Sequence, residues 1–146
     1  MRIRNMILAD YGNVYALWSS CTGMGLNSID DSQRGIAMFL KRNPDTCFVA
    51  EDNETIAGVI RAGNDGRRGF IYHTAVDPLH RGKGIGKKLV DAALASLKSL
   101  GISKVALVVF ERNEKGNVFW EQQGFTERND LIYRNKAITE VTRIDT

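Results

Sequence analysis

The stretch Tyr72-His-Thr-Ala-Val-Asp-Pro-Leu-His-Arg-Gly-Lys-Gly-Ile-Gly-Lys-Lys-Leu-Val90 lies in the middle of the 146-residue chain and predicts a strand, a glycine-rich turn and a helix in succession. Gly82, Gly84 and Gly86 leave the backbone bare where the helix begins, so several N–H groups can point outward together. Basic side chains around them would oppose the positive end of the helix dipole unless an anion bound there. The stretch therefore predicts a phosphate-binding site.

The glycine spacing excludes two better-known phosphate loops. A dinucleotide fingerprint requires Gly-x-Gly-x-x-Gly, and counting from Gly82 or from Gly84 puts no glycine at the sixth position. A P-loop requires Gly-Lys followed by Ser or Thr, but Gly86-Lys87 is followed by Lys88. A different kind of phosphate loop is therefore expected.

The remaining pattern, Arg81-x-x-Gly84-x-Gly86, resembles the acyl-CoA signature of the GCN5-related N-acetyltransferases (GNATs), Arg/Gln-x-x-Gly-x-Gly/Ala. Taken alone, these six residues also fit a simple turn with solvated lysines.

A second pattern of the same family distinguishes these alternatives. Asn-x-x-Ala-x-x-Phe-Tyr, three residues and Gly-Phe is similar to Asn113–Phe125, with Gly116 in place of alanine and Trp120 in place of tyrosine. The resemblance runs from about residue 2 to 136 and is strongest over 72–125.

The resemblance implies an α/β (α+β) fold of one domain, residues 1–146, with a mixed sheet of about seven strands and about four helices in the order β-α-α-β-β-β-α-β-α-β-β. Apolar periodicity predicts the same elements. The expected strands are 2–8, 46–51, 55–62, 70–76, 104–110, 126–128 and 131–136, and the expected helices are 10–20, 32–42, 82–100 and 115–123. The continuously apolar run 104–110 predicts a strand in the interior of the sheet. The polar tail after Ile138 is expected to be loose.

The composition excludes several classes of protein. The hydrophobic content of 43% is ordinary for a globular protein, and the chain has neither an apolar run of membrane-spanning length nor a signal peptide, so we expect a cytoplasmic protein. Apart from the glycine loop, the basic residues are spread along the chain, which favours a nucleotide cofactor over nucleic acid. Cys21 and Cys47 match no metal motif and are expected to be reduced core residues.

The family resemblance implies acetyl-CoA as cosubstrate and no metal. Its pyrophosphate would lie on the glycine loop, its pantetheine arm would pair like an added strand, and the Val76 N–H would bind the thioester oxygen. The implied cofactor-binding residues are Thr74, Ala75, Val76, Arg81, Gly82, Lys83, Gly84, Ile85, Gly86, Lys87, Asn113, Gly116, Phe119 and Trp120.

The acid and the base do not follow from the family pattern. In many relatives a tyrosine supplies the acid, but its position here is Trp120, and an indole is not a useful proton source. Tyr133 or Tyr72 is the substitute, or both are packing residues. His73 is the first candidate for the base because a histidine titrates near neutral pH, with Glu111 as the alternative. The alternatives are that His73 is a structural histidine and that Glu111 is only a surface charge.

Together these features predict an N-acetyltransferase that transfers acetyl from acetyl-CoA to a primary amine by direct attack in a ternary complex. The alternatives are a non-catalytic acyl-CoA-binding or sensing module and a phosphate-binding domain without CoA. The acceptor, a small molecule or a peptide, stays open, as does the length of the acyl group. No nucleic-acid or membrane partner is expected, and a homodimer is the alternative to a monomer. Residues 21–30 are expected to form a substrate lid or a plain connecting loop.

Overall fold

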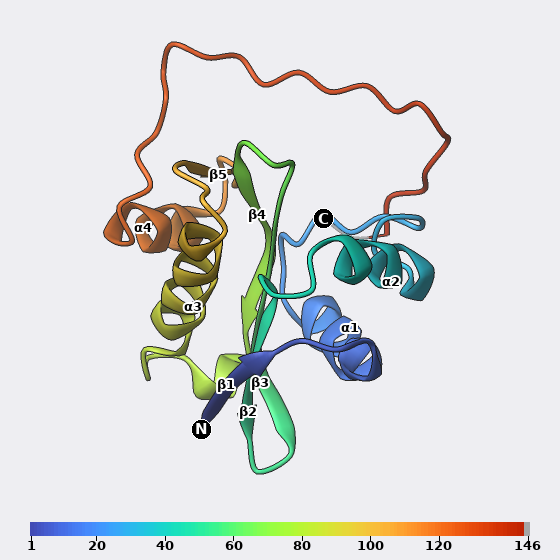
Figure 1. Ribbon diagram of the computed structural model, residues 1–146, viewed down its shortest axis with the longest axis vertical. Coiled ribbons are helices and arrows are strands. Elements are labelled where there is room, and N and C mark those ends of the chain that lie inside the picture. The colour runs from blue at the N-terminus through green and yellow to red at the C-terminus, as the bar shows by residue number, and fades with distance from the viewer. Residues whose placement is uncertain (145–146) are drawn as a thin grey trace.

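The computed structural model describes residues 1–144, in which one mixed sheet separates two pairs of helices (Figure 1). The strands are β1 (Arg2–Asn5), β2 (Phe48–Asp52), β3 (Thr55–Asn64), β4 (Gly69–Val76) and β5 (Val105–Leu107), and they lie in this order across the sheet. Neighbouring strands are antiparallel except β4 and β5, which are parallel. The predicted α/β class is confirmed.

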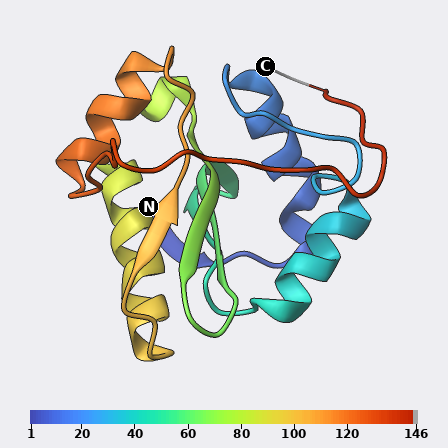
Figure 2. The same ribbon diagram turned by 90° about the horizontal axis from the view of Figure 1, so that it is seen from above.

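Two helices cover each face of the sheet (Figures 1 and 2). α1 (Tyr11–Ser20) and α2 (Gln33–Arg42) lie on one face, and α3 (Ile85–Ser99) and α4 (Glu114–Gln122) lie on the other. Because successive strand residues face opposite sides, Val59 packs in the core beneath α1 while Ile60 packs in the core beneath α3. No helix within residues 1–144 combines the length and the apolar content needed to cross a bilayer.

The helix after the glycine loop forms as predicted. Its apolar residues at four-residue spacing, Ile85, Leu89, Ala93 and Leu97, are all buried against the sheet. This stripe fixes the orientation of α3 and therefore the direction in which its first N–H groups point.

The prediction of a final hairpin at 126–128 and 131–136 is wrong. Residues 126–142, here called the C-terminal strap, contain no strand and run from α4 across to the side of α1 and α2 (Figures 1 and 2). Arg128 pairs with Asp130 at 2.8 Å within the strap, and the one apolar run, 131–133, stays exposed. With little apolar surface to bury, the strap gains too little to order as strands.

The end of the tail is held, contrary to the prediction that it is loose. Arg143 pairs with Asn27 in an isolated antiparallel bridge. The Ser28 N–H donates to the Thr142 carbonyl at 2.9 Å, and the Ile144 N–H donates to the Leu26 carbonyl at 3.1 Å. The strap is therefore fixed at both ends.

The prediction that 104–110 is an interior strand is also wrong, because β5 is a three-residue edge strand. In the described part of the chain no strand pairs with its outer edge, so Ala106 and Val108 remain exposed. Its pairing with β4 ends at Ile71 and Leu107. Beyond this point β4 pairs only with β3, which leaves a gap on the side of β5.

A bulge interrupts β4 beside this gap. Ile60 of β3 lies opposite two residues of β4, His73 and Thr74, because the register shifts by one there. The Trp18 indole N–H donates to the His73 carbonyl at 3.2 Å, which ties α1 to the bulge.

Both cysteines are free and buried. The Cys47 thiol donates to the Ala62 carbonyl at 3.4 Å, and burial raises the pKa of Cys47 to about 11. Cys47 is therefore an unreactive core residue, as expected.

Gly35 allows the loop before α2 to fold back on the helix. A Cβ at this position would collide with the carbonyl oxygens of Ile29 and Asp30, the second at 2.5 Å. We expect Gly35→Ala to lower the free energy of unfolding by about 3 kcal/mol, measured by urea denaturation. Gly12→Ala is the matched control, because Gly12 lies in α1 with open space around it, and alanine there should add about 0.5–1 kcal/mol. Equal stability of the two variants would contradict the prediction.

Candidate active site

The glycine loop presents a row of unpaired N–H groups at the start of α3. Gly82 and Gly84 have φ of +79° and +76°, a conformation that glycine adopts without strain. Among residues 1–144, no backbone or side-chain acceptor takes the N–H groups of 82–87, and the first bond of the helix runs from Lys88 N–H to the Gly84 carbonyl at 3.1 Å. Unpaired N–H groups at the positive end of a 15-residue helix form an anion-binding site.

Arg81 connects this loop to the end of β4. Its Nε donates to the Val76 carbonyl at 3.2 Å, and its Nη2 lies 3.7 Å from the Cys21 sulfur. Lys83 is exposed and has no ion-pair partner within residues 1–144. The contact with Cys21 was not anticipated, because 60 residues separate it from Arg81 in the sequence.

Val76 lies at the gap between β4 and β5. Just after it, the Asp77 N–H donates to the Ala57 carbonyl of β3 at 2.8 Å. Because successive N–H groups of a strand point to opposite edges, the Val76 N–H points away from β3, toward the gap. Its contact with a thioester oxygen stays a prediction.

α4 packs closely against the loop from the other side. Asn113 caps α4 by accepting the Gly116 N–H at 2.9 Å, and a Cβ on Gly116 would lie 2.5 Å from the Asn113 amide nitrogen. A Cβ here would displace the Asn113 side chain, so glycine lets the capping amide lie closer to α4 than the alanine of the usual family pattern would. A Cβ on Gly86 would lie 3.0 Å from the Phe119 ring, so α3 and α4 meet at this point.

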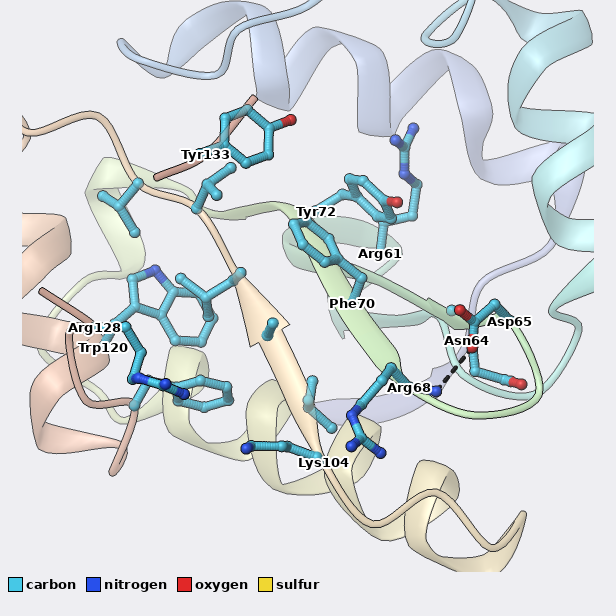
Figure 3. A pocket seen from close by; sticks show the side chains of 18 of the residues that line it. Arg61, Asn64, Asp65, Arg68, Phe70, Tyr72, Lys104, Trp120, Arg128 and Tyr133 are labelled. Atoms are coloured by element: carbon cyan, nitrogen blue, oxygen red, sulfur yellow. Dashed lines mark hydrogen bonds between the residues drawn. The ribbon is translucent and has the colours of Figure 1, made fainter. Parts of the chain in front are cut away.

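Trp120 occupies the position of the missing tyrosine. Its ring packs edge-on against Phe119 at 5.0 Å and against Phe125 at 5.3 Å between centroids. It also lines a cavity (Figure 3). Its observed role is therefore to pack and to form a wall.

That cavity, of about 2840 Å³, is open and lies between the sheet and the C-terminal strap (Figure 3). It brings together Tyr72, Tyr133 and Glu111. Tyr72 is 40% exposed; burial raises its pKa, Arg61 opposes this rise, and Tyr133 adds to it. Three of the predicted acid and base candidates thus share one cavity.

His73 lies beside this cavity rather than in its lining. Its Nε2 is 2.8 Å from Asp31 Oδ1, and its ring meets Trp18 edge-on at 5.4 Å. The same Asp31 oxygen accepts Arg61 Nη1 at 3.0 Å, and Oδ2 accepts the Asn27 N–H at 2.8 Å. Asp31, Arg61 and His73, here called the buried triad, connect the loop before α2 to β3 and β4.

The charge of Asp31 follows from these partners. Burial alone raises its pKa, but the hydrogen bond and charge of His73, the Asn27 N–H and the charge of Arg61 outweigh burial and lower the pKa. Asp31 is therefore a carboxylate at neutral pH, and it holds the His73 ring in one orientation.

The sequence interpretation missed Asp31 and Arg61 as site residues. Asp31 precedes the predicted helix over 32–42, and the cap of α2 is its neighbour Ser32, whose Oγ accepts the Gly35 N–H at 3.0 Å. The position of Arg61 in the sequence does indicate a buried ion pair, because a charged residue within the apolar run of β3 requires a buried partner.

Comparisons with known proteins agree with this geometry. The model of the Acetyltransferase (GNAT) family matches residues 12–125. An acetyltransferase of Pectobacterium atrosepticum is 33% identical over 140 residues, which cover 96% of this chain and 97% of the relative. An acetyltransferase of Yersinia pestis is 29% identical over 140 residues, with 96% and 98% covered.

Solved structures show the same fold. Ard1 from Thermoplasma volcanium superposes with a TM-score of 0.76 at 23% identity, covering 86% of this chain and 82% of the other. An aminoglycoside acetyltransferase from an uncultured soil sample, in complex with sisomicin, gives 0.75 at 19% identity and covers 94% and 96%. A Mycobacterium tuberculosis protein in complex with CoA gives 0.70 at 23% identity and covers 88% and 73%.

Proposed function

Because the chain belongs to the GNAT family of acetyltransferases, we propose that it transfers an acetyl group from acetyl-CoA to a primary amine by direct attack in a ternary complex. The observation that carries the proposal is the row of free N–H groups from Gly82 to Lys87 next to the gap between β4 and β5. We assign this activity to residues 1–146 as one domain.

The residues around the gap fit this cosubstrate. The N–H groups of 82–87 and the side chains of Arg81 and Lys83 would hold the pyrophosphate. The free edge of 74–76 would pair with the amide groups of the pantetheine arm, and α4 would close the other side with Asn113, Gly116, Phe119 and Trp120. When bound, acetyl-CoA supplies a thioester carbonyl that an amine can attack.

The Val76 N–H would stabilise the negative charge that develops on the thioester oxygen. A backbone donor held by a strand needs no reorganisation at the moment of reaction, and one such donor contributes about a hundredfold or more to a rate. This contribution depends on the backbone of β4, which the pairing of Asp77 with Ala57 orients, rather than on a particular side chain.

His73 is the proposed base. A primary amine has a pKa near 10, so it must lose a proton before it attacks at neutral pH. Asp31 occupies Nε2 of His73, which leaves Nδ1 to accept that proton. Glu111, exposed in the cavity lining, is the alternative base.

Tyr133 is the proposed acid for the departing thiolate, with Tyr72 as its substitute. The raised pKa of Tyr72 keeps its phenol protonated at neutral pH, which an acid requires. Tyr133 lies over the same cavity (Figure 3).

Ligand-dependent unfolding tests the proposal. At matched concentrations of acetyl-CoA, CoA, NAD and ATP, we expect only the first two to stabilise the protein and so raise the unfolding midpoint. A ligand at a hundred times its dissociation constant adds about 2.7 kcal/mol to the free energy of unfolding. Release of free thiol with a panel of amines then tests catalysis. Stabilisation by NAD or ATP alone would overturn the phosphate assignment, and CoA binding without thiol release would favour the non-catalytic module.

Two glycines give a matched control for this test. Gly84 and Gly101 both have positive φ and open space at Cβ, so alanine at either costs about 1–2 kcal/mol of stability. Only Gly84→Ala is expected to weaken CoA binding, because Gly101 lies at the other end of α3.

A further inference from the structure

We propose that the acceptor is an amine that also carries an anionic group, a carboxylate or a phosphate, and that Arg61 and α2 bind this group at one end of the cavity. The inference rests on the proposed function and names the class of its second substrate.

Arg61 supplies the first observation. Its side chain is 6% exposed and lines the cavity, and its Nη1 donates to Asp31. Its Nε is buried and has no partner within residues 1–144. A buried donor without an acceptor is costly, and an anionic oxygen from a ligand would remove that cost.

Two aromatic rings hold this guanidinium at the cavity. Its Cζ lies 4.8 Å from the ring centroids of both Phe39 and Tyr72. Tyr72 separates Arg61 from the open part of the cavity and is itself half exposed (Figure 3). For a ligand to reach the guanidinium, the Tyr72 ring must move.

The charges nearby favour an anion. Arg34 and Arg42, eight residues apart on α2, line the cavity and form no ion pair within residues 1–144, and Arg68 joins them from the turn before β4. Two carboxylates also line this end, Asp30 and Asp65, and the arginines outnumber them. Asp30 accepts a side-chain amide of its own loop at 2.9 Å, and Asp65 accepts two backbone N–H groups of its turn at 2.8 Å.

The opposite end of the cavity carries charges of both signs, and Arg128 lies there beside Trp120 of α4 (Figure 3). Four glutamates in and around α4 line it: Glu111, Glu114, Glu121 and Glu127. An acceptor whose anionic group binds at Arg61 would extend its amine along β4 toward the gap between β4 and β5, where the thioester would lie and which His73 borders. The arginines at the α2 end therefore favour an amine that also carries an anion over a polyamine.

Matched pairs of probes test this inference by calorimetry in the presence of CoA, which gives binding without turnover. L-lysine is compared with cadaverine, which lacks the carboxylate, and glucosamine 6-phosphate is compared with glucosamine. We expect the anionic member of at least one pair to bind about tenfold tighter or more, and that pair identifies the anion.

Variants assign the preference to this end of the cavity. Arg34→Gln with Arg42→Gln changes two exposed residues that form no ion pair within residues 1–144, and we expect it to reduce the ratio of the two affinities in a probe pair at least about threefold. Arg61→Lys keeps the charge but loses the planar fork, and it should reduce the ratio as well. Lys98→Gln is the control, because Lys98 is exposed on α3 outside the cavity, and its ratio should equal that of the wild type.

The outcomes separate this inference from the proposed function. If neither pair shows a preference, or if the preference survives in both variants, the inference is wrong even when acetyl-CoA is consumed with an amine. If the preference is found but no amine releases thiol from acetyl-CoA, the anion site stands and the proposed activity fails.

Discussion

His73→Gln is expected to lower kcat by about 100- to 10,000-fold, the usual contribution of a general base. Glutamine keeps a polar group near Asp31, 2.8 Å from the histidine nitrogen, but it cannot accept a proton at neutral pH. The measurement is the pH dependence of kcat with a saturating amine. The acidic limb of the profile, which a base produces, should disappear in the variant.

His80→Gln is the matched control for this change. Its ring also pairs with a carboxylate, Asp52 at 3.2 Å, but it lies in the turn before Arg81 and not beside the buried triad. The variant should keep the acidic limb even if its KM for acetyl-CoA changes. An unchanged limb in His73→Gln would assign the base to Glu111 instead.

Asp31→Asn is expected to lower the free energy of unfolding at pH 7 by about 3–5 kcal/mol, because it leaves Arg61 charged and uncompensated in the interior. Urea denaturation measures the change. Adding Arg61→Met removes that charge and should recover part of the loss. If the free energy of unfolding does not recover, Asp31 stabilises the fold through its bond to the Asn27 N–H rather than through Arg61.

The stability difference between the wild type and Asp31→Asn is expected to depend on pH. The pKa of Asp31 is lower in the folded protein than in the unfolded chain, so its contribution is fully present above a pH of about 4 and is lost as the pH falls through the folded value. The difference between wild type and Asp31→Asn should therefore shrink below pH 4. A difference that is constant down to pH 2 would contradict the assignment.

Local patterns predicted the parts of this molecule that depend on neighbours in sequence. The apolar stripe of α3 and the glycine loop before it follow from residues within one or two turns of each other. The buried triad could not be predicted in this way, because 30 residues separate Asp31 from Arg61 and only the packing of α2 against the sheet brings them together.

The errors at the C-terminal end have a similar cause. The run around β5 is apolar enough for an interior strand, but an interior position requires a neighbour, and the strap does not supply one. Whether the three residues 131–133 pair with β5 depends on the balance between burial and chain entropy, which their sequence alone does not determine.

The C-terminal strap forms a closed loop with the rest of the molecule, because both of its ends are held. The chain from α4 to residue 142 is closed by two backbone hydrogen bonds to the loop at 26–28, and the cavity lies beneath it. Breaking these few hydrogen bonds is a small local opening compared with unfolding, so the end of the strap can detach while the sheet stays intact.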